Sequence, residues 1–463
     1  MTDSSVLIPN QQAVSSDVLY NMKASSVRGR AYRASILPTN GTKFDAQSLT
    51  VLYVPGGRRN TFLSCQDTYL RFTIYNQDAA TNDLVIDGNA SAFINRIDIF
   101  HASNLLETIQ GYNIIYQYML DNQLNVAQRA GLSAMYGCNS AFDGTRYGQT
   151  ILKGAQLTVC VPILSGTIGL GNLKSLPIGQ LNDDIRIEIT WENINPPVLY
   201  VATGTTTVAT AQPASTACWQ ITNCELECNI IELSDEGMHM VEQVTPFSQP
   251  VFIMGNSWRH YTANLTSGTS GTYSTLVPAR FASLKTLHML PQVASVTTAY
   301  DKYSICNRVN PNFAQLWYRL GAYIIPQKFI NIQSGTTGGY AELFAENQRA
   351  WHALNHPEYA GSLPFSYFNV AHTADATTVG GGGILAANTG NNGHKNAFGY
   401  SQELETFSQR SDVLLSGVNT LSSQVFFEAN IGTTAPNVAY TLHFYANYDH
   451  VLVLQDGILS VRF

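Results

Sequence analysis

The sequence predicts an all-β protein with short helical inserts, built as two tandem eight-stranded jelly rolls. Short apolar runs alternate with polar positions and end at Gly, Pro, Asn or Asp, which is typical of strands joined by turns. The two halves repeat one order of elements with an offset of roughly 220 residues, which suits two copies of one domain. Helical inserts among eight or so short strands favour a jelly roll over an immunoglobulin-type sandwich.

Chain length supports this division. With 463 residues, the chain exceeds the size at which a single hydrophobic core keeps growing. We therefore predict an N-terminal arm at residues 1–45, a first jelly roll at 46–233, a linker helix at 234–249 and a second jelly roll at 250–463.

The composition narrows the class of protein. Charged residues make up only 12% of the chain, and Thr, Ser, Asn, Gln, Gly and Tyr replace them, which suits strands and protein-protein contact. The net charge of −7 argues against wholesale binding of nucleic acid. No apolar stretch is long enough to span a membrane, and the start lacks a signal-peptide pattern, so we expect folding in a reducing compartment.

The predicted arm carries a local excess of positive charge. No acidic residue lies between Val18 and Lys43, and the candidate contact residues are Lys23, Arg28, Arg30, Arg33 and Lys43. A basic arm of this kind is either a solvated terminus or a contact with a neighbouring subunit. Direct binding of nucleic acid ranks third, because five charges over some twenty residues attract a polyanion only weakly.

The first half reads as strands with one helical insert. The cleanest strand is 185–191, in which Ile185, Ile187 and Ile189 alternate with polar residues. At 112–133 the apolar residues follow helical spacing, so we expect one or two helices there. Residues 195–216 are expected to form a long loop. The expected strands are 49–54, 60–63, 68–75, 93–100, 157–163, 185–191 and 219–231.

The second half repeats this order after a short helix capped by Ser234 and ended near Pro246. Its expected strands are 250–254, 273–277, 281–290 and 313–325, followed by a helix at 340–354 and a glycine-rich loop at 380–393. The chain closes with an alternating strand at 438–446, for which we predict 424–430 as the pairing partner, and with strands at 451–454 and 458–463.

The sequence offers no strong catalytic or metal motif. The seven cysteines form no Cys-x-x-Cys pair, and Cys224 and Cys228 alternate with polar residues as core-facing thiols of a strand. His352 and His356 have the spacing of a zinc pair, but the intervening Glu of such a motif is missing and Pro357 follows, so we expect two ordinary histidines at a helix end.

Two further weak signals receive structural interpretations. Residues 169–175 lack the Gly-Lys pair of a phosphate-binding loop. Asp183 and Asp184 are expected to begin a strand in solvent rather than to act as an acid-base pair. We therefore predict no catalytic residue, no cofactor, no metal and no enzymatic activity.

Several stretches in both halves resemble a known family. They resemble double jelly-roll major capsid proteins of the adenovirus and nucleocytoplasmic large DNA virus lineage, most of all polinton-like, adinto-like and virophage-type members. The stretches are 58–63, 176–181, 185–189, 318–328 with the helix from Tyr340, 414–420, 425–428, and 445–448 with 456–459.

The resemblance implies a structural function. Each chain would place its two jelly rolls side by side, and three chains would form a pseudo-hexagonal capsomer of an icosahedral double-stranded DNA virus shell. The implied partners are two further copies, neighbouring capsomers, and minor capsid and penton proteins, in a virion assembled inside the host cell. Loops 195–216 and 375–397 would form an outer tower, and the arm would lie at the capsid base.

Two other functions remain as alternatives. A carbohydrate-binding or carbohydrate-processing jelly-roll protein would be a monomer or dimer with exposed aromatic residues on one face or a carboxylate pair in a cleft. A minor or vertex capsid protein usually has a single jelly roll, which the internal repetition disfavours.

Overall fold

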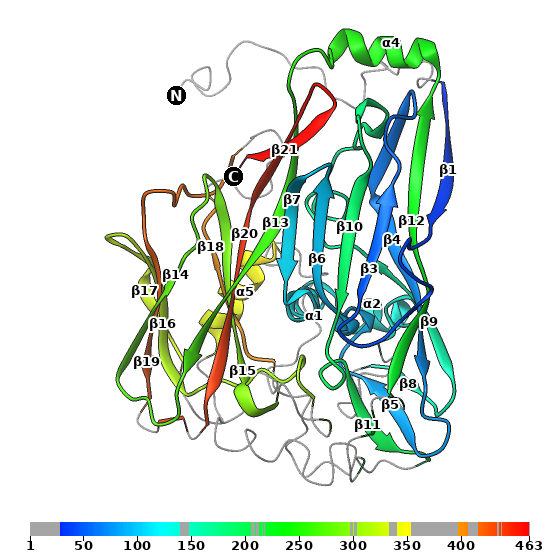
Figure 1. Ribbon diagram of the computed structural model, residues 1–463. Helices are drawn as coiled ribbons and strands as arrows, with labels where there is room; N and C mark the ends of the chain where they lie inside the picture. Colours follow the sequence, from blue (N-terminus) through cyan, green and yellow to red (C-terminus); the bar gives the residue numbers. More distant parts are fainter. Residues whose placement is uncertain are drawn as a thin grey trace, which may run out of the picture.

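The described residues form two β-sandwiches that stand side by side and are joined by one helix (Figure 1). In the computed structural model, the residues whose structure is described are 28–138, 148–204, 209, 213–214, 216, 218–296, 300, 303–332, 340–352, 397–405, 415–432, 435–436 and 438–462.

The first sandwich has two main antiparallel sheets. One contains, in spatial order, β1 (Gly29–Ile36), β12 (Trp219–Leu233), β4 (Thr61–Asn76) and β9 (Gln156–Pro162), with β2 (Lys43–Phe44) also paired to β12. The other contains β3 (Leu49–Val54), β10 (Ile185–Trp191), β6 (Ile94–His101) and β7 (Asn104–Gln110). A small third sheet contains β11 (Val198–Ala202), β5 (Asn82–Ile86) and β8 (Thr150–Ile151).

The second sandwich repeats the eight strands of the two main sheets in the same order, but it has no counterpart of the small third sheet among the described residues. Its first sheet contains β13 (Val251–Leu265), β20 (Tyr440–Gln455), β15 (Leu284–Val293) and β18 (Tyr400–Glu403), with β21 (Ile458–Arg462) paired to β20. Its second sheet contains β14 (Thr272–Val277), β19 (Val425–Ile431), β16 (Phe313–Leu320) and β17 (Tyr323–Asn331). In chain order, β1 thus corresponds to β13 and β7 to β17, so each half is an eight-stranded unit with the same topology.

Helices occupy equivalent places in the two halves. Between β7 and β9 lie α1 (Tyr112–Gln123), α2 (Val126–Gly131) and α3 (Ser133–Tyr136), and between β17 and β18 lies α5 (Ala341–Ala350). The connecting helix α4 (Asp235–Val244) begins at Ser234, whose side chain accepts a hydrogen bond from the Gly237 N–H. Short 3-10 turns are η3 (Ala90–Phe93), η4 (Ile178–Gln180) and η6 (Ala294–Val296).

The predicted alternation produces the two cores. Ile185, Ile187 and Ile189 of β10 point inward and are fully buried, whereas the polar residues between them are partly exposed. Trp191 packs edge-on against Phe72 of the facing sheet at 5.3 Å between ring centroids. Burying a large apolar side chain contributes roughly 1.5–3 kcal/mol, so each sandwich is stabilised chiefly by its inward faces.

The predicted arm has to be shortened. Residues 29–36 form β1, which pairs with β12 and occupies the place that β13 has in the second sandwich. Tyr32, Ala34 and Ile36 alternate and pack on the core, a pattern that the basic charge of the segment obscured. Part of the expected loop 195–216 is likewise a strand, β11. The remaining domain boundaries stay predictions.

The predicted hairpin near the C-terminus is wrong. β19 pairs with β14 and β16, whereas β20 pairs with β13, β15 and β21, so the two strands lie in opposite sheets. Phe427 and Phe444 meet across the sandwich, with ring centroids 5.3 Å apart. Alternation correctly identified both strands, but each needs a distant partner that a local turn signal cannot reveal.

Strand lengths also differ from expectation. The run expected to end at Pro326 contains two strands, β16 and β17, with a turn at Gly321 (φ +57°) between them. The expected strands 60–63 and 68–75 are one strand, β4, and 438–446 and 451–454 are one strand, β20. The glycine-rich loop 380–393 lies outside the described residues.

Candidate functional site: the junction between the sandwiches

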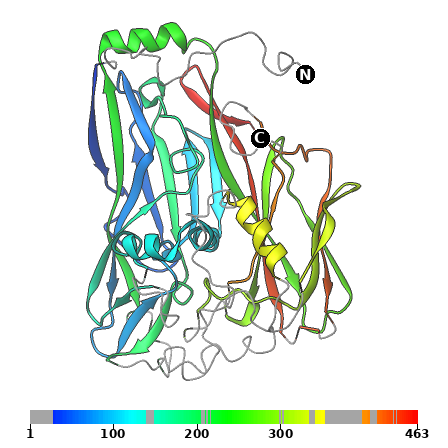
Figure 2. The ribbon, with the colours of Figure 1, turned by 180° about the vertical axis from the view of Figure 1, so that it is seen from behind.

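The junction forms where β7 and α1 of the first sandwich meet the outward face of the β13 sheet. Strand β7 lies against β13, and Figure 2 shows α1 and α5 at the same height in the middle of the molecule. The Tyr445 hydroxyl donates to the carbonyl of Gly111, just before α1, at 2.8 Å. Gly111 has φ +58°, and a Cβ there would lie 2.5 Å from that hydroxyl, so the close approach requires glycine.

Glu107 is the first of three buried carboxylates that hold the halves together. It lies on β7, is 3% exposed, and accepts a hydrogen bond of 2.5 Å from the Ser257 hydroxyl of β13. Within its own sandwich it accepts from Ser165 and from the N–H groups of Gly166 and Thr167. The carboxylate is thus surrounded by donors from both halves, which offsets its removal from water.

Asp87 is the second buried carboxylate at the junction. It follows β5, is 1% exposed, and accepts hydrogen bonds from three consecutive backbone N–H groups of the second half, those of Ser304, Ile305 and Cys306. Burial raises the pKa of Asp87 to about 6, although these hydrogen bonds oppose the shift. The carboxylate therefore binds residues 304–306, a segment of the second half that has no regular secondary structure of its own.

Asp121 of α1 is the third buried carboxylate at the junction. It accepts from Arg129 of its own half at 3.2 Å and from Arg308 of the second half at 2.6 Å, and all three side chains are 1% exposed. Gln117 adds a fourth group by donating to the same carboxylate. Removing one partner of such a buried ion pair costs about 3–5 kcal/mol, because the remaining charge stays uncompensated.

An aromatic cluster fills the space beside these carboxylates. Tyr118 of α1 meets His288 of β15 and Trp351 after α5, and Trp351 stacks on Trp258 of β13 at 5.6 Å. The Tyr118 hydroxyl and Nδ1 of His288 both lie within hydrogen-bonding distance of the Ser401 hydroxyl. Burial lowers the pKa of His288 to about 3, so the ring is neutral in this setting.

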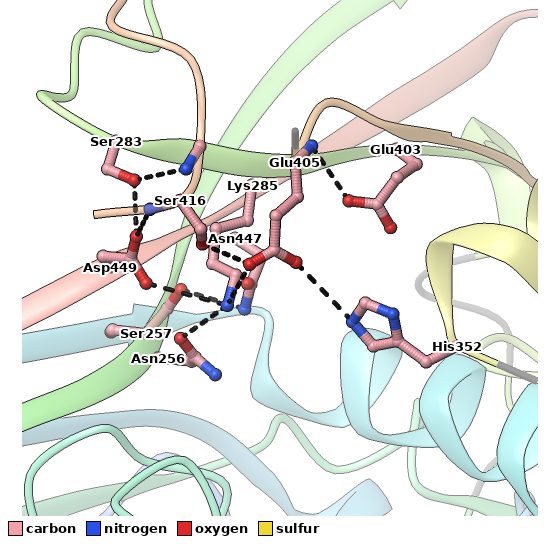
Figure 3. A network of polar contacts seen from close by, with 11 residues as sticks. Asn256, Ser257, Ser283, Lys285, His352, Glu403, Glu405, Ser416, Asn447 and Asp449 are labelled. Atoms are coloured by element: carbon pink, nitrogen blue, oxygen red, sulfur yellow. Dashed lines mark hydrogen bonds and ion pairs between the residues drawn. The ribbon is translucent and has the colours of Figure 1, made fainter. Parts of the chain in front are cut away.

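A second polar cluster lies next to the aromatic one (Figure 3). Lys285 Nζ is 3.1 Å from Glu405 and 3.7 Å from Asp449, whose side chains are 2% and 1% exposed. Ser416 donates to Glu405 and Ser283 donates to Asp449. Burial raises the pKa of the nearby Glu403 to about 7. The positive charge of Lys285 thus lies beside two buried carboxylates. The nearby Glu403 is more readily protonated than an ordinary glutamate.

The two clusters border a cavity of about 350 Å³. Met119 and Leu170 of the first sandwich line one side, and Trp258, Lys285 and Trp351 of the second line the other. Residues 169–172, whose resemblance to a phosphate loop was weak, pack here: the Asn256 N–H donates to the carbonyl of Gly171. This segment is part of the junction rather than an anion-binding loop.

Of the basic residues singled out from the sequence, the four that the structure describes lie away from the junction. Arg30 and Arg33 of β1 pair with Glu232 and Glu227 of β12. Arg28 and Lys43 are exposed, and Lys23 lies outside the described residues. The structure therefore brings two of the five together on one edge strand and does not test their role in subunit contact.

Other sequence expectations can be checked directly. Cys224 and Cys228 are buried, and Asp183 and Asp184 are exposed ahead of β10, as predicted. His352 follows α5, whereas His356 lies outside the described residues. Among the described residues, no group of three His, Cys, Asp or Glu side chains could hold a metal ion. No helix in the described part of the chain is long and apolar enough to cross a membrane.

The sequence reasoning missed all three junction carboxylates. Asp87, Glu107 and Asp121 stand singly among apolar and polar residues, and no local motif marks them. For Asp121 alone a hint was available, because it lies within the predicted helical stretch 112–133, and the structure buries nearly every residue of that helix.

Comparison with known proteins gives a consistent result for the fold. No family model matches this sequence, and neither does any curated protein. Among solved structures, VP54 of PBCV-1, fitted into a reconstruction of the virophage Sputnik, gives a TM-score of 0.60 at 10% identity, covering 96% of this chain and 100% of that chain. The Faustovirus major capsid protein gives 0.56 at 9% identity, covering 94% and 92%.

The mavirus major capsid protein gives a TM-score of 0.51 at 10% identity, covering 98% of this chain and 97% of that chain. The likeness therefore includes both sandwiches and their order along the chain. The fold is a double jelly roll. The junction described above is the contact between its two jelly rolls.

Proposed function

We propose that this chain is the major capsid protein of an icosahedral double-stranded DNA virus, and that three copies form a pseudo-hexagonal capsomer. The observation that carries the proposal is the match to capsid proteins over nearly the full length of both chains. A partial match would be expected if one jelly roll had been joined to an unrelated function.

The junction supports a role as a rigid building block. Glu107, Asp87 and Asp121 each accept hydrogen bonds from the second jelly roll, so the angle between the jelly rolls is fixed by buried polar contacts. A shell subunit needs such a fixed angle, because an error in it is repeated at every contact in the lattice. The low charge content of 12% suits a chain that buries much of its surface against neighbours.

The proposal includes an orientation in the shell. The small sheet of β5, β8 and β11 lies at the opposite end of the molecule from α4 (Figure 1). We assign the end with β11 to the outer surface, together with the expected tower loops, and the end with α4 to the capsid base. The carbonyl of Arg28, the first described residue, accepts a hydrogen bond from the Ser234 N–H ahead of α4, which supports an arm at this base.

The expected partners follow from this orientation. Neighbouring capsomers would contact the sides, while minor capsid and penton proteins would contact the base or the edges of the shell. Contact with the genome would be limited to the N-terminal arm. The protein would reside in the virion after synthesis in the host cell, and the proposal assigns it no catalytic step and no cofactor.

Size-exclusion chromatography with light scattering tests the proposal. We expect a stable species with three times the chain mass of 50.7 kDa, and electron microscopy should show particles with a six-fold outline. A chain that stays monomeric at all concentrations and binds sugars would overturn the proposal in favour of a carbohydrate-binding protein.

A further inference from the structure

The cavity at the junction has an apolar side and a polar side. The apolar side is formed by three side chains of the first jelly roll and two tryptophans of the second, namely Met119, Leu164, Leu170, Trp258 and Trp351. The polar side includes Asn256, Lys285 and His352 of the second jelly roll. Its volume of about 350 Å³ lies near the lower end of the range of roughly 300–1,000 Å³ for small-molecule sites. The cavity therefore suits a small molecule with an apolar body.

The charge beside the cavity is unbalanced. Lys285, on the cavity wall, lies next to two buried carboxylates, those of Glu405 and Asp449, so one negative charge is left over. A buried charge without a counter-ion is costly, and a cation in the cavity would offset it.

The basic side chains of α5 and of its C-terminal end do not restore the balance. Burial lowers the pKa of His352, so its ring adds no positive charge at neutral pH. Arg349 acts on Glu403, but it lies 3.9 Å from Glu346 and its side chain is 55% exposed. The missing cation therefore has to come from elsewhere.

Glu405 has one oxygen available for such a cation. Its Oε1 accepts from Ser416 and lies 3.1 Å from Nζ of Lys285. Its Oε2 accepts no hydrogen bond among the described residues, although the side chain is only 2% exposed. This oxygen points toward His352, which lines the cavity and whose Nε2 is 4.0 Å away (Figure 3). The unused acceptor thus lies next to the polar side of the cavity.

Two helices end at the same cavity. Helix α1 ends at Gln123 and helix α5 ends at Ala350, and both residues line it. The C-terminal end of a helix carries a partial negative charge, which favours a cation nearby. The helix ends and the carboxylates therefore favour the same sign of charge in a ligand.

We propose that this cavity binds a small organic ammonium ion. The apolar body of the ligand lies against Leu170 and the two tryptophans, and its ammonium group donates to Oε2 of Glu405 beside His352. The apolar side favours an organic cation over a metal ion, because metal ions in proteins take a shell of oxygen, nitrogen or sulfur ligands. Every residue of the site belongs to one chain, so the site goes beyond the proposed function and does not depend on trimer formation.

Three ligands of similar shape and different charge test this site. Cyclohexylmethylamine, cyclohexylmethanol and cyclohexanecarboxylate are titrated separately into the full chain at neutral pH, with calorimetry as the measurement. We expect the amine to bind at least about tenfold more tightly than the alcohol, because only the amine carries the missing charge. The carboxylate should bind more weakly than either.

Two variants locate the binding. Glu405→Gln removes the excess negative charge, so it should reduce the advantage of the amine over the alcohol to less than about twofold and leave the affinity for the alcohol unchanged. Leu170→Trp, at a partly exposed position, should fill the apolar side and weaken the binding of both ligands at least about tenfold. The matched control is Glu428→Gln on β19, where the carboxylate also pairs with a basic residue but lies in the other sheet, and it should change neither affinity.

The wild-type titrations alone can refute the site. An amine that binds no more tightly than the alcohol, a carboxylate that binds best, or no binding by any of the three would overturn it. An amine preference that survives Glu405→Gln, or binding that Leu170→Trp does not weaken, would also overturn it, since the ligand would then lie elsewhere. None of these results bears on the proposed capsid role, which the mass of the species in solution tests.

Discussion

At the scale of single residues, the three buried carboxylates of the junction all come from the same jelly roll. The first jelly roll supplies the carboxylates of Asp87, Glu107 and Asp121, and the second jelly roll supplies donors that include Ser257 and Arg308. A buried carboxylate without donors is costly, and so is a buried donor without an acceptor. Each half therefore completes the hydrogen bonding of the other, which couples the folding of one to the placement of its neighbour.

Asp87 makes this coupling dependent on pH. Its pKa is raised from 3.8 to about 6 in the folded protein, so its stabilising contribution is present at low pH and is lost as the pH rises through 6. We expect the stability of the wild type relative to Asp87→Asn to fall by about 2 kcal/mol between about pH 4.5 and 7.5. Urea unfolding of both proteins at several pH values measures this difference.

Asp78→Asn provides the control. Hydrogen bonds from Thr81, Ala80 and Asn82 hold the pKa of Asp78 at about 2, against the opposing effect of partial burial. The contribution of Asp78 is therefore complete above about pH 5 and should not change across the same range. A constant difference between the wild type and Asp87→Asn would contradict the role assigned to Asp87.

Lys285 gives a second residue-scale prediction. Lys285→Met leaves Glu405 and Asp449 buried without their cation and should lower the free energy of unfolding by about 3–5 kcal/mol. Lys174→Met, at an exposed position, should change it by less than about 0.5 kcal/mol. If the loss is electrostatic, adding Glu405→Gln and Asp449→Asn to Lys285→Met recovers part of it. A loss below about 1 kcal/mol in Lys285→Met would argue against a buried charge network.

At the scale of elements, the sequence predicts strands better than their partners. Alternation located β10, in which one face is buried, and also β20, although the junction buries both faces of β20. It could not place β19 opposite β20, since pairing between distant strands leaves no local trace. β1 was missed because basic residues on its outward face dominated the pattern, and the junction carboxylates were missed because isolated acidic residues are common on any surface.

Helix α4 was predicted from its cap, and the cap can be tested. Ser234 accepts from the Gly237 N–H, so Ser234→Ala should destabilise the connection between the jelly rolls by about 1 kcal/mol, whereas Ser234→Asp should retain most of it. Hydrogen exchange of the α4 amides is the sensitive measurement, because the helix exposes Met240 and Val244 and has little packing to hold it. Equal exchange in the two variants would show that the cap is unimportant.

At the scale of the whole molecule, two copies of one topology perform different tasks. The first jelly roll presents its β7 side to the second, and the second presents the face of its β13 sheet to the first. The equivalent strands β17 and β1 lie at the left and right sides of the molecule (Figure 1). Duplication of one topology thus leaves β17 and β1, the counterparts of the two junction strands β7 and β13, outside the junction.

Acid sensitivity is expected of the molecule as a whole. Burial lowers the pKa of His260 to about 4 and those of His288 and His443 to about 3, from an ordinary value of 6.5. Their stabilising contribution is complete above pH 6.5 and is lost as the pH falls, because these histidines bind protons in the unfolded chain at a pH at which they stay neutral in the folded chain. Asp87 and Glu403, with pKa values raised to about 6 and 7, act in the opposite direction.

His101, His352 and His450 also have lowered pKa values and Glu192 has a raised one, so the histidines outnumber these carboxyl groups and unfolding takes up at least about one net proton between about pH 6.5 and 4.5. We therefore expect the free energy of unfolding to fall by about 1–2 kcal/mol for each unit by which the pH is lowered in this range. Tryptophan fluorescence, to which Trp258 and Trp351 at the junction contribute, measures the unfolding. His443→Gln should reduce this slope, since it removes one of the three histidines. A chain whose stability is constant or rises as the pH falls from 6.5 to 4.5 would show that the buried histidines do not dominate.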